Sequence, residues 1–442
     1  MSLPGASPGR VLGGLASQCL DLWAHPGLAL FYGGLVRSKN VLSVMNSILV
    51  RRARTSWLQR VGALTTCSSL QVIAALVSVE WVLYAFSIAF DTGGMVKGGY
   101  NLRSFFGSLG NGGLHNVHTH RLGPTTYPLN TLAMFQLTFA IITVAIISGA
   151  YVERMKHSAV MLFSSLWLVA VYCPLAHMVW SGDGAFLHDL GVLDFAGGLV
   201  VHTSSGVAGL VCALCIRART GYPRIPKAPH SLVLTHIGAA FLWVGWFGFN
   251  AGSAGAADFS AAQALMVTQV ASSAGVLAWS TVEWALFKRP SSLGMLSGAL
   301  AGLVGITPAS GSSGVYGALF IGSFCAIATF LASTRLKEWM GACCSAPLGI
   351  RRRSLARPGA FSFQESTMTP WTPLASTPWA ASSARCGRAC GAAPRWAARA
   401  TARSCTRAGA ARRSPTSAGS WACRRCPSPS SSPGSSSARY WP

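Results

Sequence analysis

The feature that most constrains this chain is a series of apolar runs, each close in length to a membrane-spanning helix. About 20 helical residues cross roughly 30 Å of hydrocarbon, and a spanning segment must satisfy its own backbone hydrogen bonds because lipid offers no partners. A buried core helix of a soluble protein could explain one such run, but not nine in succession. Only 10% of the 442 residues are charged, against about 25% in soluble domains. The nine runs lie at residues 14–36, 70–90, 129–150, 158–180, 195–216, 230–252, 261–286, 293–309 and 314–333. We therefore predict an all-α multi-pass membrane protein.

Basic residues alternate between the connections, which sets the expected orientation. Every second connection is basic, whereas the intervening ones carry acids such as Asp183, Asp189 and Asp258. Lys and Arg collect on the cytoplasmic side of membrane proteins. The basic positions are Arg37 and Lys39, Arg154 and Lys156, Arg217 to Lys227, Lys288 and Arg289, and Arg335 and Lys337. We expect the N-terminus outside, the tail in the cytoplasm and the plasma membrane as the location.

Two stretches lie outside this pattern. Residues 51–69 hold four Arg between neighbouring apolar runs, which suggests an insert. Residues 338–442 are rich in Arg, Ser, Pro and Cys without an apolar period, so we expect a disordered tail. Its Cys pairs lack neighbouring His, and we expect no metal, no cofactor and no nucleic-acid partner.

Ionisable residues inside apolar runs are costly and therefore candidates for function. Asp194 stands where an external loop meets a helix, so its carboxylate can cap backbone N–H groups or handle protons. His202 follows two turns later on roughly the same face. It is either a satisfied core residue or a group that exchanges a hydrogen bond with a small polar solute. An intramembrane hydrolase using this pair is a weak alternative, since no nucleophile motif accompanies it, and we expect no enzymatic activity.

Aromatic residues near the external ends form a second group of candidates. Trp180 is either an interfacial anchor or a cation–π platform for a small cation. Phe139 and Phe249 are packing residues or, if they line a pore, a dry constriction. Ser253 would place a hydroxyl near the outer mouth.

The candidate residues lie within a set of distinctive strings. The set is PGLALFYGGLVRSKNVLSVM, FQLTFAIITVAIISGAYVERMKHSA, PLAHMVW, LDFAGGLVVHTSSG, LWVGWFGFNAGSAG and LSGALAGLVGITPASG. Together these strings resemble the ammonium transporter family, which includes the Rh proteins. They occur in family order, and the resemblance covers about 26–50 and 70–337. The resemblance makes 26–337 the transporter domain and 1–25 a diverged start.

The resemblance implies an eleven-helix inverted repeat, commonly a homotrimer, that carries ammonium, ammonia and methylammonium. It implies recruitment of ammonium at Trp180, Phe139 and Ser253, a gate of Phe139 and Phe249, a buried acid at Asp194 that serves structure or deprotonation, and a pore histidine at His202. A PII-type regulator is the cytoplasmic partner that the resemblance suggests.

The sequence departs from the family pattern in its last part. The family's second pore histidine has no counterpart, because none of the ten histidines follows His236. The expectation is that helices ten and eleven are missing, by truncation or a frame change, and that transport is weak or absent. A non-transporting ammonium sensor or an inactive truncated paralogue is the alternative function; uptake of methylammonium abolished by Trp180→Leu would separate it from a transporter.

Overall fold

The computed structural model describes residues 16, 19–36, 69–115, 117, 128–152, 154–216 and 229–336. All of them belong to one of two compact units, Met1–Ala389. The predicted insert 51–69, apart from Ser69, and the predicted tail 338–442 lie outside the described residues. Within the described ranges the chain is mostly helical, and Val96 and Gly99 form an isolated bridge.

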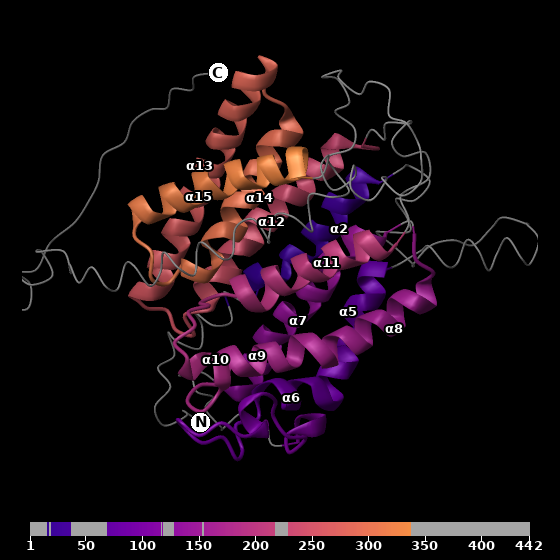
Figure 1. Ribbon diagram of the computed structural model, residues 1–442, viewed down its shortest axis with the longest axis vertical. Coiled ribbons are helices and arrows are strands. Elements are labelled where there is room, and N and C mark those ends of the chain that lie inside the picture. The colour runs from indigo at the N-terminus through magenta and orange to yellow at the C-terminus, as the bar shows by residue number, and fades with distance from the viewer. Residues whose placement is uncertain are drawn as a thin grey trace, which may run out of the picture. The chain divides into compact units, whose positions relative to one another are not determined.

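The helices follow one another as shown in Figure 1. The α-helices are α2 (Ala24–Leu35), α5 (Ser69–Glu80), α6 (Phe86–Phe90), α7 (Leu129–Tyr151), α8 (His157–Trp167), α9 (Cys173–Trp180), α10 (Phe186–Asp189), α11 (Ser204–Cys215), α12 (Leu232–Gly252), α13 (Phe259–Phe287), α14 (Ser292–Ile306) and α15 (Val315–Leu331). Short π-helical segments are η2 (Trp81–Ala85), η5 (Leu168–Tyr172), η6 (Gly198–Thr203) and η8 (Ala332–Leu336). The 3₁₀ turns are η3 (Leu102–Ser104), η4 (Gly112–Leu114) and η7 (Thr307–Ala309).

Eight of the described helices are long and apolar enough to cross a membrane. They are Leu70–Phe90, Leu129–Tyr151, His157–Trp180, Gly198–Cys215, Leu232–Gly252, Phe259–Phe287, Ser292–Ala309 and Val315–Thr334. Each matches one predicted run to within three residues at either end, so the membrane fold is confirmed. The predicted first span is the exception: α2 has 12 residues, fewer than the roughly 20 that a crossing needs, and a turn at Trp23 separates it from helical residues 19–22.

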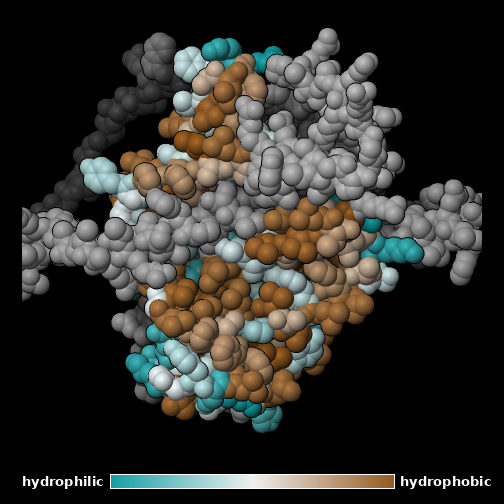
Figure 2. Space-filling view, in the orientation of Figure 1, coloured by the Kyte–Doolittle hydropathy of each residue, from teal (hydrophilic) through white to brown (hydrophobic). Residues whose placement is uncertain are grey.

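The outer surface of these helices is apolar. Hydrophobic side chains cover much of the visible face in Figure 2, and hydrophilic ones gather mainly at its margins. Leu162, Leu277 and Tyr316 are 63%, 68% and 89% exposed. Apolar area of this extent would be unfavourable in water but is expected where lipid tails surround the protein.

Small residues allow two helix pairs to pack closely. In α14, Gly294, Gly298 and Gly302 all face α13, where a Cβ on Gly298 would lie 2.4 Å from the Gly275 carbonyl oxygen. This is the packing face that their four-residue spacing predicts. In the second pair, α2 packs on α12, and a Cβ on Gly238 would lie 2.2 Å from the backbone nitrogen of Phe31.

Helix α7 occupies the interior of the main hydrophobic cluster. In its most apolar stretch of 18 residues, 83% of the residues are buried. Helix α7 packs against α2, α5, α11 and η6. Because α7 carries Phe139 and η6 carries His202, the predicted site residues belong to elements that touch one another in the core.

Candidate functional site

The turn that begins at Asp194 is built around its buried carboxylate. Oδ1 accepts the N–H groups of Gly197 and Gly198 at 2.9 and 2.6 Å, and Oδ2 accepts those of Leu199 and Val200 at 2.8 and 2.9 Å. The first N–H groups of a helix have no partner within the helix, and here one side chain satisfies four. The capping interpretation of Asp194 therefore describes its geometry.

Gly197 is required for this turn. Its φ of +99° lies in the left-handed region, where a side chain would be strained. A Cβ there would also lie 2.6 Å from a Val201 methyl group. The glycine lets the chain double back so that the following N–H groups point at the carboxylate.

Trp180 is fixed by the same turn. Its indole Nε1 donates to the Asp194 carbonyl oxygen at 2.9 Å. The Phe139 ring meets the Trp180 ring edge-on, with centroids 5.7 Å apart and an interplanar angle of 87°. Trp180 is half-buried, so it borders solvent while holding a defined orientation.

Phe139 and Phe249 form a stacked pair. Their centroids are 4.1 Å apart at an interplanar angle of 11°, and the residues are 1% and 3% exposed. The rings come from α7 and α12, which are far apart in sequence. Such a pair is a dry barrier to any charged solute, because an ion between the rings would lose its water without gaining polar partners.

His202 lies directly beyond this pair. Its ring centroid is 5.9 Å from that of Phe249, and it stacks on Trp246 at 5.2 Å with an interplanar angle of 9°. The side chain is 1% exposed, and neither ring nitrogen has a hydrogen-bond partner among the described residues. Among the described residues, His202 is therefore not a core histidine with satisfied ring nitrogens.

Ser253 is at the end of α12, one turn from Phe249. Its Oγ donates to the Phe249 carbonyl oxygen at 2.9 Å, so the hydroxyl hydrogen is used within the helix and the oxygen lone pairs remain available as acceptors. The structure thus brings together Trp180, Phe139, Phe249, His202 and Asp194 through direct contacts, with Ser253 attached through the backbone.

The sequence of this chain is similar to those of known proteins. The profile of the Ammonium Transporter Family matches residues 56–343. An ammonium transporter of Bacillus subtilis is 42% identical over 316 residues, which are 72% of this chain and 70% of that protein. The chain belongs to the ammonium transporter family. The ammonium transporter Amt1 of Archaeoglobus fulgidus is 39% identical and matches 74% of this chain and 73% of its own length.

Solved structures of this family have the same fold. The crystal structure of Candida albicans Mep2 superposes with a TM-score of 0.66 at 29% identity, covering 85% of this chain and 73% of that chain. Saccharomyces cerevisiae Mep2 gives a TM-score of 0.63 at 27% identity, covering 87% and 85%. The predicted ammonium-transporter fold is confirmed.

Two residues of the transporter site were missed by the sequence analysis. Trp246 stacks on His202, and its Nε1 donates to Thr307 Oγ1 at 3.0 Å. Its position three residues before Phe249 places both rings on one helix face, a signal present in the sequence. Nothing in the sequence pairs it with Thr307, which lies 61 positions further along the chain.

His177 was also missed, although it lies one turn before Trp180. It is fully buried, and its Nε2 donates to the Arg103 carbonyl oxygen at 2.8 Å. This bond holds the connection that follows α6 against α9. We infer a structural role behind the aromatic residues.

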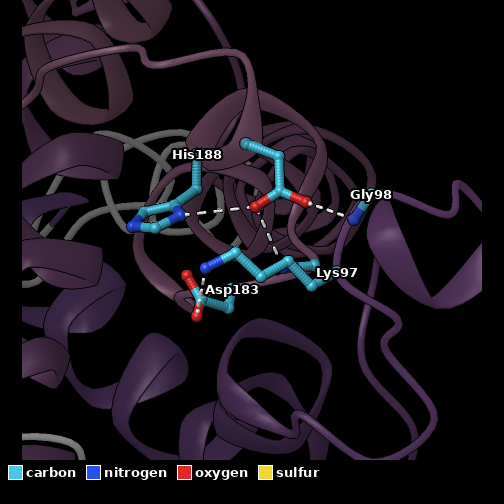
Figure 3. Close-up of polar contacts among 6 residues, drawn as sticks. Lys97, Gly98, Asp183 and His188 are labelled. Atoms are coloured by element: carbon cyan, nitrogen blue, oxygen red, sulfur yellow. Dashed lines mark hydrogen bonds and ion pairs between the residues drawn. The ribbon is translucent and has the colours of Figure 1, made fainter.

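Polar contacts join the connection after α6 to the connection after α9 (Figure 3). Lys97 Nζ lies 2.9 Å from Asp183 Oδ2, and Asp189 accepts the N–H groups of Gly98 at 3.2 Å and Gly184 at 3.0 Å. These N–H donors lower the pKa of Asp189, and the neighbouring Asp183 raises the pKa of Lys97. Asp183, His188 and Asp189 hold ligand atoms within 4.8 Å of one another, but the Lys97 ammonium already neutralises Asp183.

Proposed function

We propose that this chain moves ammonium across the membrane by recruiting the cation at an outer aromatic cup and passing neutral ammonia through an apolar gate. The observation that carries the proposal is a continuous series of ring contacts. Trp180 meets Phe139 at 5.7 Å, Phe139 meets Phe249 at 4.1 Å, and Phe249 meets His202 at 5.9 Å. The series leads from the half-buried end of α9 to a buried imidazole.

The physics of each step follows from the side chains. Ring faces attract a small cation by about 0.5–2 kcal/mol, depending on desolvation, which recovers only part of the cost of removing its water. Ammonium escapes this cost by giving up a proton to water at the half-buried Trp180 end, so that neutral ammonia passes the Phe pair. Potassium has no proton to lose and stays behind.

His202 is suited to receive the neutral solute. A neutral imidazole has one N–H donor and one acceptor nitrogen, and both nitrogens lack partners among the described residues. Ammonia has three N–H donors and one lone pair, so it can bond to either nitrogen. Asp194 acts by holding the turn and Trp180, and Ser253 offers its oxygen to the ammonium N–H groups at the outer mouth.

The remaining features of the proposal come from family membership. We propose a homotrimer in the plasma membrane with the N-terminus outside, methylammonium as a second substrate, and a PII-type regulator as the cytoplasmic partner. The family is one of transporters, and we infer transport rather than catalysis as the activity of this chain.

Uptake of labelled methylammonium into vesicles that contain the purified protein tests the proposal. We expect saturable uptake that ammonium inhibits and that potassium does not, and a large loss in Trp180→Leu. Trp284→Leu is the matched control, since it removes an indole that is 64% exposed on α13. Uptake no greater than in empty vesicles, or equal conduction of potassium, would contradict the proposal.

The same vesicles test the expectation of weak transport. The rate per molecule is compared with that of a family member whose tenth helix carries a histidine. A rate within twofold of that member would show the expectation to be wrong, whereas a rate well below it would support it.

A further inference from the structure

Two ionisable residues interrupt the first apolar run and have no place in the transport scheme. Asp21 and His25 are four positions apart, on either side of the turn at Trp23. Asp21 is 1% exposed. Burying a carboxyl in a membrane protein is costly, so its position requires a reason.

Both side chains reach the same residue of α7. The Thr138 hydroxyl donates to Asp21 Oδ2, and His25 Nε2 lies 3.2 Å from the Thr138 carbonyl oxygen. A carbonyl only accepts, so Nε2 carries the hydrogen. Asp21 and His25 therefore contact the hydroxyl and the carbonyl oxygen of one residue that is more than 100 positions away.

Thr138 directly precedes the gate residue Phe139, and α2 touches both helices that carry the gate. It packs against α7, which bears Phe139, and against α12, which bears Phe249. Contact with α12 is close: a Cβ on Gly27 would lie 2.8 Å from the Leu242 nitrogen. The segment that contains Asp21 and His25 thus connects the two sides of the aromatic stack.

We propose that Asp21 and His25 are positioning residues that set the Phe139–Phe249 gate by fixing Thr138; this proposal rests on the proposed function. A stack with centroids 4.1 Å apart leaves little tolerance, because a gap of about 0.5–1 Å forfeits a quarter to a half of the dispersion attraction. Small movements of α7 at Thr138 would therefore open or misalign the pair.

The contacts of Asp21 and His25 with Thr138, called the clamp from here on, contribute more to the geometry of the gate than to stability. The Thr138 hydroxyl has a second acceptor, the Phe135 carbonyl oxygen at 2.5 Å, so loss of Asp21 does not leave it unpartnered. Replacing a buried polar group by an apolar one costs little when the group it contacted keeps another partner. We expect Asp21→Leu to fold as well as the original protein.

The test compares Asp21→Leu with Asp21→Asn in vesicles, using methylammonium. Asparagine keeps an oxygen for the Thr138 hydroxyl, whereas leucine does not. Since Asp21→Leu removes a buried hydrogen bond next to the gate, we expect it to lower the maximal rate roughly tenfold. The apparent KM should stay within about twofold because the Trp180 cup is unchanged, and Asp21→Asn should restore the rate to within about twofold.

Thr138→Val shows whether Asp21 acts through Thr138. The double variant Asp21→Leu/Thr138→Val should lose no more than Asp21→Leu alone, since residues in one network are not additive. Ser272→Ala is the matched control, because it removes another buried interhelical hydrogen bond, to the Ala299 carbonyl oxygen at 3.3 Å. Thermal unfolding of each purified variant separates lost transport from lost structure.

Each outcome bears on the proposal. Normal transport by Asp21→Leu, equal defects in Asp21→Leu and Asp21→Asn, or a further loss in the double variant would overturn the clamp while leaving the proposed function intact. No uptake by the original protein would overturn both.

Discussion

Asp194 and His202 are eight residues apart in one stretch of chain, yet their surroundings are opposite. The Asp194 carboxylate accepts four backbone N–H groups. The His202 imidazole has no hydrogen-bond partner among the described residues. Their exposures are 8% and 1%, so burial does not distinguish them.

Under the proposed function, this difference separates a group that holds the turn, Asp194, from one that would receive the solute, His202. A carboxylate whose acceptors are filled cannot also bind a solute without giving up bonds that hold the turn. An unpartnered buried imidazole has kept its hydrogen-bonding capacity at the cost of desolvation, and a solute that reaches it recovers that cost. The predictions below test this division of labour, beginning with the largest expected effect.

Asp194→Leu should be the most damaging change. It leaves four buried N–H groups without their acceptor, and at about 1–3 kcal/mol for each unsatisfied group the loss is roughly 4 kcal/mol or more. We expect a marked fall in the unfolding temperature of the purified protein and uptake about 100-fold lower. Asp194→Asn, which keeps one oxygen, should have an unfolding temperature and an uptake between those of Asp194→Leu and the original protein. A stable, monodisperse Asp194→Leu protein would break the comparison.

His202→Leu should reduce transport without loss of stability. Leucine replaces the ring with an apolar group and removes no hydrogen bond that the described residues make with it. We expect a maximal methylammonium rate roughly tenfold lower, the effect of losing one polar contact to the solute, with an unfolding temperature equal to or above the original. A large drop in that temperature would mean that His202, like Asp194, is structural.

Two variants at Trp180 separate cation recruitment by its ring from the hydrogen bond that its indole donates to the Asp194 turn. Trp180→Leu removes both the ring face and the N–H donor, and should raise the apparent KM about 2- to 30-fold if cation–π attraction of roughly 0.5–2 kcal/mol is lost. Trp180→Phe keeps a ring face but cannot donate to the Asp194 carbonyl oxygen. An intermediate KM for Trp180→Phe is expected; a KM equal to that of Trp180→Leu would place the effect in the hydrogen bond alone.

Lys97→Gln should have the smallest effect. The Lys97–Asp183 pair is exposed, with side chains 73% and 62% accessible, and exposed pairs contribute little. We expect uptake within about twofold of the original at neutral pH, measured with Trp284→Leu as the neutral reference.

The pH dependence of the contacts of Lys97 and Asp189 follows from the shifted pKa values of these two groups. The pKa of Asp189 is lowered from 3.8, so its stabilising effect is present above that value and is lost only as pH falls through the lower folded pKa. The pKa of Lys97 is raised from 10.5, so its effect is lost only as pH rises through the higher folded value. Uptake by Lys97→Gln relative to the original should therefore be constant between about pH 5 and pH 9; a ratio that changes in this window would contradict this account.

The sequence by itself determined the spans and the candidate site residues. Apolar runs of about 20 residues locate membrane helices because length and desolvation are local properties, and this held for the eight runs that the structure describes in full. The first run is described only in part. There Asp21 and His25 lie within an apolar stretch, and their partner Thr138 is 117 and 113 positions away. The order of the sequence motifs likewise matched one family, and this match singled out Trp180, Phe139, Phe249, Asp194 and His202 as candidate site residues.

Only the tertiary structure decided which hydrogen bonds and ring contacts each of these residues makes. The alternatives for Asp194 and His202 could not be separated by sequence, because both are ionisable residues of one apolar segment. The local turn at Gly197 turned four N–H groups toward Asp194, and the packing of α12 placed Trp246 and Phe249 against His202 without supplying a hydrogen bond. Hydrogen-bond satisfaction depends on distances and directions between distant parts of the chain, and these are fixed only when the helices pack.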